Sequence, residues 1–282
     1  MNFDLRPPLP PPRAEDLSRS HDSSGYPPEL LRSVLSRMYC AAEILQLGTE
    51  ARFASLVLFQ RYYFAAETMQ GAETAAEGAR WHLGHVAASC LFLGCKAEED
   101  VRRIRDCVNL AHVLDFAGIR GGRDDAEGYK GTGGATSYAA DVDIFEAAGP
   151  PELDESYWKE KGRIVATEQE VLRVIQFDVS VGHPHRAVLL ILDGMEWARQ
   201  DAALVEETWM VLNDATFHAP ALRHSIFAMA CGAIMLSVER MTADRRDLAI
   251  QPPPRWWSAM GMTDSQVNAA KKSLSDAAAG SL

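Results

Sequence analysis

Residues 87–106 read AASCLFLGCKAEEDVRRIRD, and this stretch decides the fold more than any other part of the chain. Small and apolar residues run without a break from 87 to 95, and the run ends abruptly at Lys96. A segment this apolar, yet too short to span a membrane, is typical of a helix that is buried on all sides. Lysine carries a strongly hydrated charge, so we expect Lys96 to lie where the core meets a partner.

The composition is that of a protein with a large core and an acidic surface. Of the 282 residues, 47% are hydrophobic, which is enough for one large core or two of ordinary size. The net charge of −11 disfavours broad electrostatic binding to nucleic acid or to an anionic membrane. No apolar run reaches the roughly 20 residues of a membrane span, and no hydrophobic signal segment opens the chain. We therefore expect a soluble intracellular protein whose 5 cysteines are buried and reduced.

The chain is helical in pattern almost throughout, and no convincing strand pattern is found. Residues 1–26 contain RPPLPPPR and SRSHDSSG, so this N-terminal segment is predicted to be disordered. Residues 118–153 are rich in glycine and are predicted to form a long insertion. Apolar periodicity predicts helices at about 28–47, from Thr49, 79–97, 101–117, 155–176, 184–199, 202–217 and 221–240, and a last helix capped by Thr263 and Gln266. The 221–240 helix is again apolar nearly all round, so we predict two helical bundles, each built around one buried helix.

One carboxylate lies inside an apolar helix face. Glu168 follows Ile164 by four residues and precedes Val171 by three, which places it within the apolar stripe of the 155–176 helix. A carboxylate on such a face is costly unless it is paired, and Lys96, at the end of the buried helix of the same bundle, is the natural partner. The spacing leaves two interpretations open, an ion pair that merely closes the bundle and an ion pair that binds a partner.

Several motifs together resemble a cyclin box. In the first half they are LFQRYY at 58–63, ASCLFLGCKAEE at 88–99, RRIRD at 102–106 and TEQEVLRVIQFDV at 167–179. In the second half the chain resembles L-type cyclins, with cyclin Q and cyclin K as near alternatives, through HPHRAVLLIL at 183–192, WMVLND at 209–214 and PPPRWWSAMGMTDSQV at 252–267. The resemblance implies an all-α fold of two tandem five-helix cyclin boxes, the first at 27–182 with the insertion 118–153 and the second at 183–278.

The resemblance also implies a function and a partner. Cyclins bind and activate a cyclin-dependent protein kinase without catalytic activity or a cofactor of their own. L-type cyclins imply a role in transcription or pre-mRNA processing, in the nucleus. The second box would offer a surface for a further transcription or splicing partner.

Site residues can be carried over from the family position by position. The lysine and glutamate with which cyclins grip their kinase fall on Lys96 and Glu168, the two residues that the spacing had already paired. Ala97 stands where the family often has a larger apolar residue, which makes the kinase pocket smaller. The apolar residues that the resemblance assigns to kinase binding are Leu93, Leu172, Phe177 and Val179.

Some residues are also compatible with other functions. The arginines Arg102, Arg103 and Arg105 are candidates for a secondary interaction with an activation segment or RNA, although a solvated helix start is the simpler interpretation. A helical scaffold without a kinase, or a binding module like general transcription factor IIB, remains an alternative, although the acidic charge disfavours direct nucleic-acid binding. The histidine pairs at 82–85 and 183–185 lack a third metal ligand, and the aspartates at 124–125 and 141–143 lie in the insertion. We therefore expect no enzyme, no metal site and no membrane contact.

Overall fold

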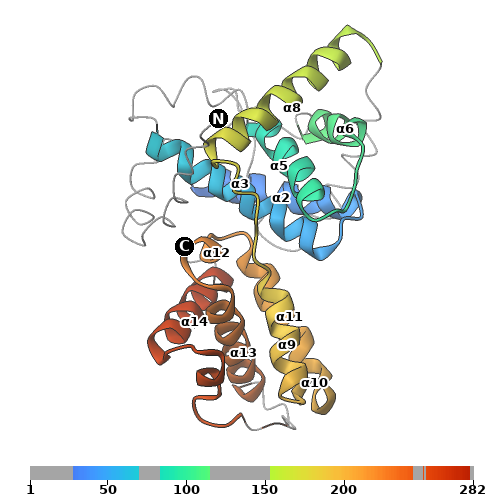
Figure 1. Ribbon diagram of the computed structural model, residues 1–282. Coiled ribbons are helices and arrows are strands. Elements are labelled where there is room, and N and C mark those ends of the chain that lie inside the picture. Colours follow the sequence, from blue (N-terminus) through green and yellow to red (C-terminus); the bar gives the residue numbers. More distant parts are fainter. Residues whose placement is uncertain (1–27, 70–82, 115–152, 244–249, 251, 280–282) are drawn as a thin grey trace, which may run out of the picture. The chain divides into compact units, whose positions relative to one another are not determined.

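The computed structural model describes residues 28–69, 83–114, 153–243, 250 and 252–279. Within these residues the regular structure is helical only, and the chain divides into two compact units between Val181 and Gly182 (Figure 1). The predicted all-α fold is confirmed. The disordered N-terminus predicted at 1–26 lies outside the described residues, as does the insertion predicted at 118–153 apart from Leu153.

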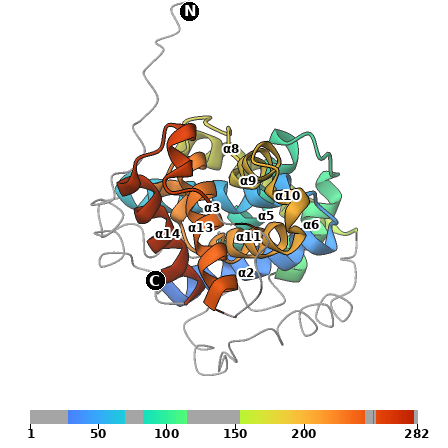
Figure 2. The same cartoon turned by 90° about the horizontal axis from the view of Figure 1, so that it is seen from below.

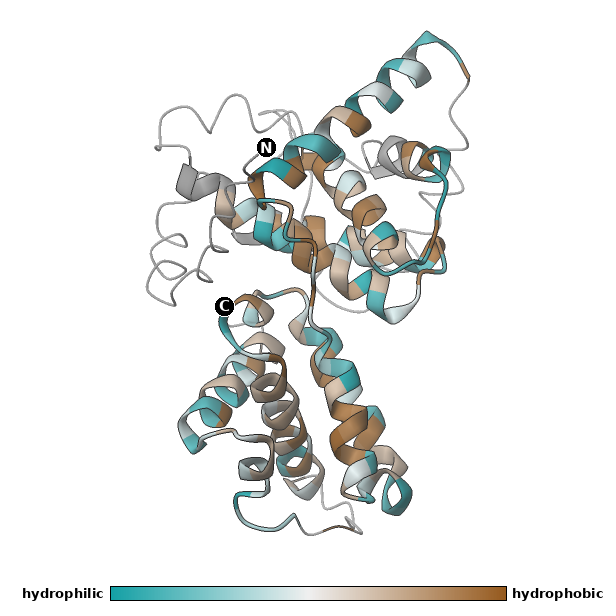
Figure 3. Cartoon of the chain, in the orientation of Figure 1, coloured by the Kyte–Doolittle hydropathy of each residue, from teal (hydrophilic) through white to brown (hydrophobic). Residues whose placement is uncertain are grey.

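The first unit is built around its predicted buried helix. Its helices are α2 (Pro28–Ile44), α3 (Thr49–Met69), α5 (Leu83–Ala97), α6 (Ile104–Leu114) and α8 (Glu155–Val174). Helix α5 contacts all four others, and from Leu83 to Cys95 only Phe92 is not buried. Figure 3 shows hydrophobic residues concentrated along α3 and α5. The apolar run from 87 to 95 is thus explained, because every side of α5 faces another helix.

Glycine allows α3 and α5 to approach closely. A Cβ atom built on Gly94 of α5 would lie 2.8 Å from the backbone N and 2.9 Å from the Cα of Ser55 on α3. Ser55 is itself fully buried, and its Oγ donates a 2.7 Å hydrogen bond to the carbonyl of Ala51. No larger residue fits at position 94 without moving the α3 backbone.

The second unit repeats this plan around another buried helix. Its elements are α9 (Pro184–Gly194), α10 (Trp197–Gln200), α11 (Ala202–Ala215), α12 (Pro220–Arg223), α13 (Ile226–Ala243), the 3-10 helix η3 (Trp256–Met260) and α14 (Asp264–Ala278). Helix α13 contacts α9, α11 and α14 (Figure 2). Its Gly232 lies against α14, where an added Cβ would be 2.8 Å from the backbone N of Lys271.

Helix α13 needs one correction to the sequence-based expectation. Among the described helices it is long and apolar enough to cross a membrane, although no such segment was expected. Length and composition alone do not separate a span from a core helix. Most apolar residues of α13, among them Cys231, Ile234 and Leu236, are buried in the core of the second unit, whereas Ile226 and Phe227 at its start are exposed. This burial accounts for the composition of α13 without a membrane.

Several predicted helix ends were wrong by a few residues. The predicted helix at 221–240 is interrupted before α13, because Ser225 Oγ accepts a 3.3 Å hydrogen bond from the backbone N–H of Ala228 and so caps the new helix. The helix predicted at 184–199 ends at Gly194, since Glu196 takes a left-handed conformation with φ 59° before α10. The capping box of Thr263 and Gln266 at the start of α14 is confirmed.

A buried histidine makes the stability of the second unit depend on pH. His185 is 2% exposed, its Nε2 donates a 3.2 Å hydrogen bond to Asn213 Oδ1, and its ring centroid lies 4.7 Å from that of Trp209. Burial lowers the pKa of His185 to about 4, because the interior disfavours the charged imidazolium.

We predict that the second unit loses stability as the pH falls below the ordinary histidine value of about 6.5. There the unfolded chain binds a proton that the folded chain excludes, so the free energy of unfolding falls by about 2 kcal/mol between pH 7 and pH 5. The loss is complete once the pH is below about 4. Urea unfolding at both pH values, compared between the wild type and His185→Gln, measures the contribution. An equal pH dependence of the two proteins would contradict the prediction.

Candidate functional site

The structure brings Lys96 and Glu168 together as the spacing predicts. Lys96 Nζ, at the end of α5, forms an ion pair and hydrogen bond with Glu168 Oε1 on α8. The Glu168 side chain is 12% exposed, whereas the Lys96 side chain is 43% exposed. The carboxylate is therefore almost buried, while the ammonium group remains accessible to water or to a partner.

An aromatic ring completes the environment of the lysine. Lys96 Nζ lies 4.3 Å from the ring centroid of Phe92, one helical turn earlier on α5, which is cation–π geometry. Phe92 is also the one residue between Leu83 and Cys95 that is not buried. Phe92 was not predicted as a site residue, although its spacing of four residues from Lys96 is a signal for this contact.

Polar contacts fix α8 against α5 over several turns. His85 pairs with Glu160, and Ser89 Oγ donates a 3.1 Å hydrogen bond to the carbonyl of Ile164. The hydrogen bond with His85 lowers the pKa of Glu160. With Lys96 and Glu168, the contacts advance along both helices together, so α5 and α8 run in the same direction here. This packing brings Glu168 to the end of α5, where Lys96 is accessible.

The predicted apolar site residues differ in their accessibility. Leu93 is only 5% exposed, Leu172 and Val179 are partly buried, and Phe177 is 69% exposed. Leu172 and Phe177 are also joined by a 2.7 Å hydrogen bond from the amide of Phe177 to the carbonyl of Leu172. The assignment of these residues to kinase binding stays a prediction.

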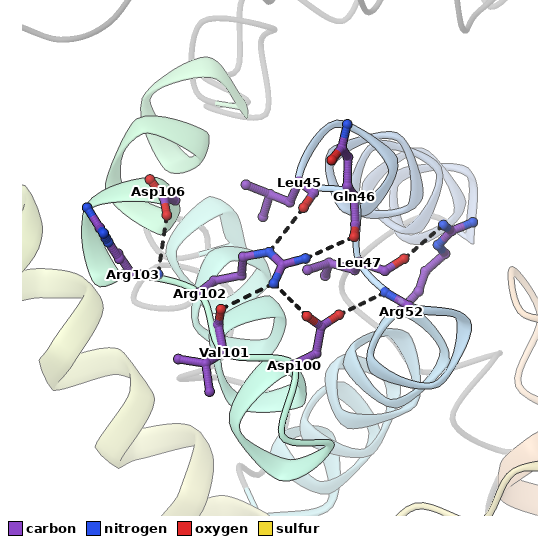
Figure 4. A network of polar contacts seen from close by, with 10 residues as sticks. Leu45, Gln46, Leu47, Arg52, Asp100, Val101, Arg102, Arg103 and Asp106 are labelled. Atoms are coloured by element: carbon purple, nitrogen blue, oxygen red, sulfur yellow. Dashed lines mark hydrogen bonds and ion pairs between the residues drawn. The ribbon is translucent and has the colours of Figure 1, made fainter.

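The three arginines of RRIRD have different environments. Arg102 is anchored within the chain (Figure 4), because its Nε and Nη2 donate to the carbonyls of Leu45 and Gln46 at 3.1 and 2.9 Å. Its Nη1 pairs with Asp100, whose other carboxylate oxygen accepts a 2.8 Å hydrogen bond from the amide of Gly48. The side chains of Arg103 and Arg105 are exposed. Arg102 thus ties the segment before α6 to the turn between α2 and α3, and a secondary interaction of the three arginines stays a prediction.

We predict that Arg102→Ala lowers the free energy of unfolding by about 1–3 kcal/mol, because two backbone carbonyls and a carboxylate lose a charged donor. Arg105→Ala is the matched control, since the Arg105 side chain is 60% exposed and its carboxylate neighbour lies 3.9 Å away. A change within about 0.5 kcal/mol is expected for the control. Urea unfolding of both variants measures the difference, and equal effects would show that Arg102 is no anchor.

The described residues offer little for covalent or metal chemistry. Cys90, Cys95, Cys107 and Cys231 are buried, and Cys40 is partly buried. Burial raises the pKa of Cys95 to about 11 and that of Cys107 to about 12, which disfavours the reactive thiolate. Within the described part of the chain, no three residues among His, Cys, Asp and Glu are grouped so that they could hold a metal ion.

Known proteins of similar sequence support one family. No family model matches the chain. Cyclin-L1 of Danio rerio is 25% identical over 231 residues, which cover 82% of this chain and 38% of the relative. The cyclin L homolog cyl-1 of Caenorhabditis elegans is 26% identical over 81% of this chain and 42% of the relative, and human cyclin-L2 is 26% identical over 80% and 36%. The predicted resemblance to L-type cyclins is confirmed. The chain spans about two fifths of the length of these L-type cyclins.

Two solved structures contain a chain of similar fold. A chain in the crystal structure of the yeast RNA Pol II CTD kinase CTDK-1 complex matches with a TM-score of 0.65 at 16% identity, over 93% of this chain and 71% of that chain. A chain of the CAK complex from Chaetomium thermophilum bound to ATP-gamma-S matches with a TM-score of 0.50 at 14% identity, over 94% and 70%. At these identities the likeness concerns the fold alone.

Proposed function

We propose that this chain is a cyclin-like regulatory subunit that binds and activates a cyclin-dependent protein kinase. The observation that carries the proposal is the Lys96–Glu168 pair, which is buried on the glutamate side and 43% exposed on the lysine side. The exposed part of the lysine is available for contact with a partner. The resemblance to L-type cyclins over four fifths of the chain supports the same conclusion.

The proposed binding surface lies at the ends of α5 and α8. It consists of Lys96 and Glu168 with Leu93, Leu172, Phe177 and Val179, the residues to which the family resemblance assigns this role. Phe92 joins the surface, because its ring stacks on the Lys96 ammonium group. This surface combines an accessible cation with the exposed ring of Phe177 and partly buried apolar side chains, a composition that suits a helix with an apolar face and a polar edge.

The proposed mechanism is a shift between two states of the kinase. Phosphoryl transfer needs the kinase's own lysine–glutamate pair to be assembled around ATP. The cyclin-like subunit binds the regulatory helix of the kinase in the position where that pair forms, and so favours the active state. The size of the activation equals the difference in its affinity for the two kinase states. The subunit supplies no catalytic group or cofactor.

We also propose a role in transcription or pre-mRNA processing in the nucleus, from the likeness to L-type cyclins. The net charge of −11 argues against direct contact with nucleic acid, so the kinase carries the activity to its substrates. The second unit is proposed to bind a further protein of the same process. Exposed apolar side chains on α9 and α11 support this, with Leu190 69% and Met210 54% exposed.

Affinity purification from native extract tests the proposed function. The tagged wild type is compared with the double variant Lys96→Ala/Glu168→Ala, and the eluates are analysed by mass spectrometry and for kinase activity. A matched control is Glu155→Ala/Lys159→Ala, which removes an exposed ion pair from the same helix α8. Circular dichroism melting shows whether each variant is folded.

A protein kinase that is recovered with the wild type and the control, and lost with a folded Lys96/Glu168 variant, supports the proposal and identifies the partner. If no eluate contains a kinase, the fold serves as an interaction scaffold and the proposal is wrong. If the kinase is recovered equally with all three proteins, the binding surface lies elsewhere on the chain.

A further inference from the structure

The turn that follows α8 has an unfavourable backbone conformation. Gln176 and Phe177, two consecutive residues that are not glycine, have φ values of 56° and 61°. The left-handed region is sterically costly for residues with a Cβ atom, and for a bulky residue such as phenylalanine it is a clear outlier. Such conformations persist only where surrounding contacts hold them in place.

Local hydrogen bonds hold one side of this turn. The amide of Phe177 donates to the carbonyl of Leu172 at 2.7 Å, and the amide of Asp178 donates to the carbonyl of Ile175 at 3.1 Å. The first bond reaches the last turn of α8, and the second reaches Ile175, directly after it. Within the turn, the amide of Val179 also donates to the carbonyl of Phe177 at 3.1 Å. The next contact of the outgoing backbone comes from another helix.

An arginine from α3 binds the outgoing backbone. Arg61 Nη1 donates to the carbonyl of Asp178 at 3.0 Å and to the carbonyl of Ser180 at 2.9 Å, across sequence separations of 117 and 119 residues. The same atom lies 3.6 Å from the Asp178 carboxylate. The Arg61 side chain is 27% exposed, so water competes only partly for these bonds. The guanidinium therefore bridges the two carbonyls on either side of Val179, directly after Phe177.

We infer that Arg61 is a positioning residue for the proposed kinase-binding surface, because it holds the strained turn that presents Phe177 and Val179. The inference rests on the proposed function, and it gives LFQRYY, the motif that contains Arg61, a role of its own. Arg61 acts through the backbone of the turn and needs no contact with the kinase. Without Arg61, the left-handed residues relax and the two apolar side chains lose their fixed direction.

The state of the turn can be measured without any partner. Chymotrypsin cleaves after phenylalanine, and cleavage after Phe177 requires local opening of the turn. We expect Arg61→Ala to raise the rate of this cleavage about tenfold, since cleavage follows the population of the open form. Arg105→Ala is the control, because it removes an exposed arginine of the same unit and should leave the rate unchanged.

A second substitution separates positioning from general stability. Gln176→Gly removes the steric penalty of the left-handed conformation at position 176, so the turn should persist without the Arg61 hydrogen bonds. We therefore expect Arg61→Ala/Gln176→Gly to restore both slow cleavage after Phe177 and binding of the kinase recovered with the wild type. Arg61→Ala alone should weaken that binding about tenfold at a temperature where the protein remains folded.

Each outcome decides the inference. Unchanged cleavage in Arg61→Ala, or increased cleavage with unchanged kinase binding, overturns it while leaving the proposed function intact. Weakened binding that Gln176→Gly does not restore also overturns it, because the loss then has another origin. If the wild type binds no kinase, the proposed function and the positioning role fail together, and the cleavage assay still reports whether Arg61 holds the turn.

Discussion

Replacing Lys96 with alanine is expected to weaken kinase binding by tenfold to hundredfold and to destabilise the first unit. The variant leaves the Glu168 carboxylate, which is 12% exposed, without its cation. Removing one partner from a fully buried pair costs about 3–5 kcal/mol. Because the Lys96 side chain is 43% exposed, we expect a smaller loss here, of about 1–3 kcal/mol. A kinase that covers the site removes the remaining water, so the unpaired carboxylate is costlier in the complex.

The two members of the pair should not be equivalent. Glu168→Gln keeps the shape of the side chain and a hydrogen-bond acceptor, and it leaves the unpaired charge on Lys96, which water can reach. This variant should therefore lose less unfolding free energy than Lys96→Ala. Urea unfolding measures stability, and titration of the recovered kinase measures affinity. Equal losses of stability in the two variants would contradict the claim that Glu168 is nearly buried while Lys96 is accessible to water.

The position of this pair could be predicted from the sequence because Lys96 ends an unbroken apolar run and Glu168 lies on a periodic helix. A carboxylate within an apolar stripe needs a partner of opposite charge, and the lysine at the end of the apolar run of the same bundle is such a partner. The same reasoning identified both buried helices, α5 and α13. Phe92 carries a weaker signal, because only its position one turn before Lys96 relates it to the pair.

The turns could not be predicted in the same way. Gln46, Gln176 and Glu196 have positive φ values at or near helix ends, where glycine would have been the sequence signal. Local hydrogen bonds close these turns, as from the amide of Gln176 to the carbonyl of Arg173, and a distant arginine, Arg61, binds the backbone after the turn that follows α8. Arg102 likewise finds its carbonyl partners 56 and 57 residues away. Contacts across such separations leave no periodic trace in the sequence.

The buried helix α5 depends on a single glycine for its closest contact. Gly94→Val is expected to lower the free energy of unfolding by about 3 kcal/mol or more, at the upper end of the usual penalty for overpacking. The reason is that an added Cβ would overlap backbone as well as the Ser55 hydroxyl, because it would lie 2.8 Å from the backbone N of Ser55. A flexible side chain could move aside, whereas here α3 itself must shift, together with the buried Ser55. A melting temperature lower by roughly 6–12 °C is expected for a unit of this size.

Gly162 on α8 provides the matched control, because it is also a helical glycine and an added Cβ meets nothing within 4 Å. Gly162→Val should be neutral or slightly stabilising, by a few tenths of a kcal/mol, since valine is the better helix former. Gly94→Ala should fall between the two, because its gain in helix propensity, about 1 kcal/mol, offsets part of the clash. If Gly94→Val and Gly162→Val melt at the same temperature, α3 and α5 are further apart than described.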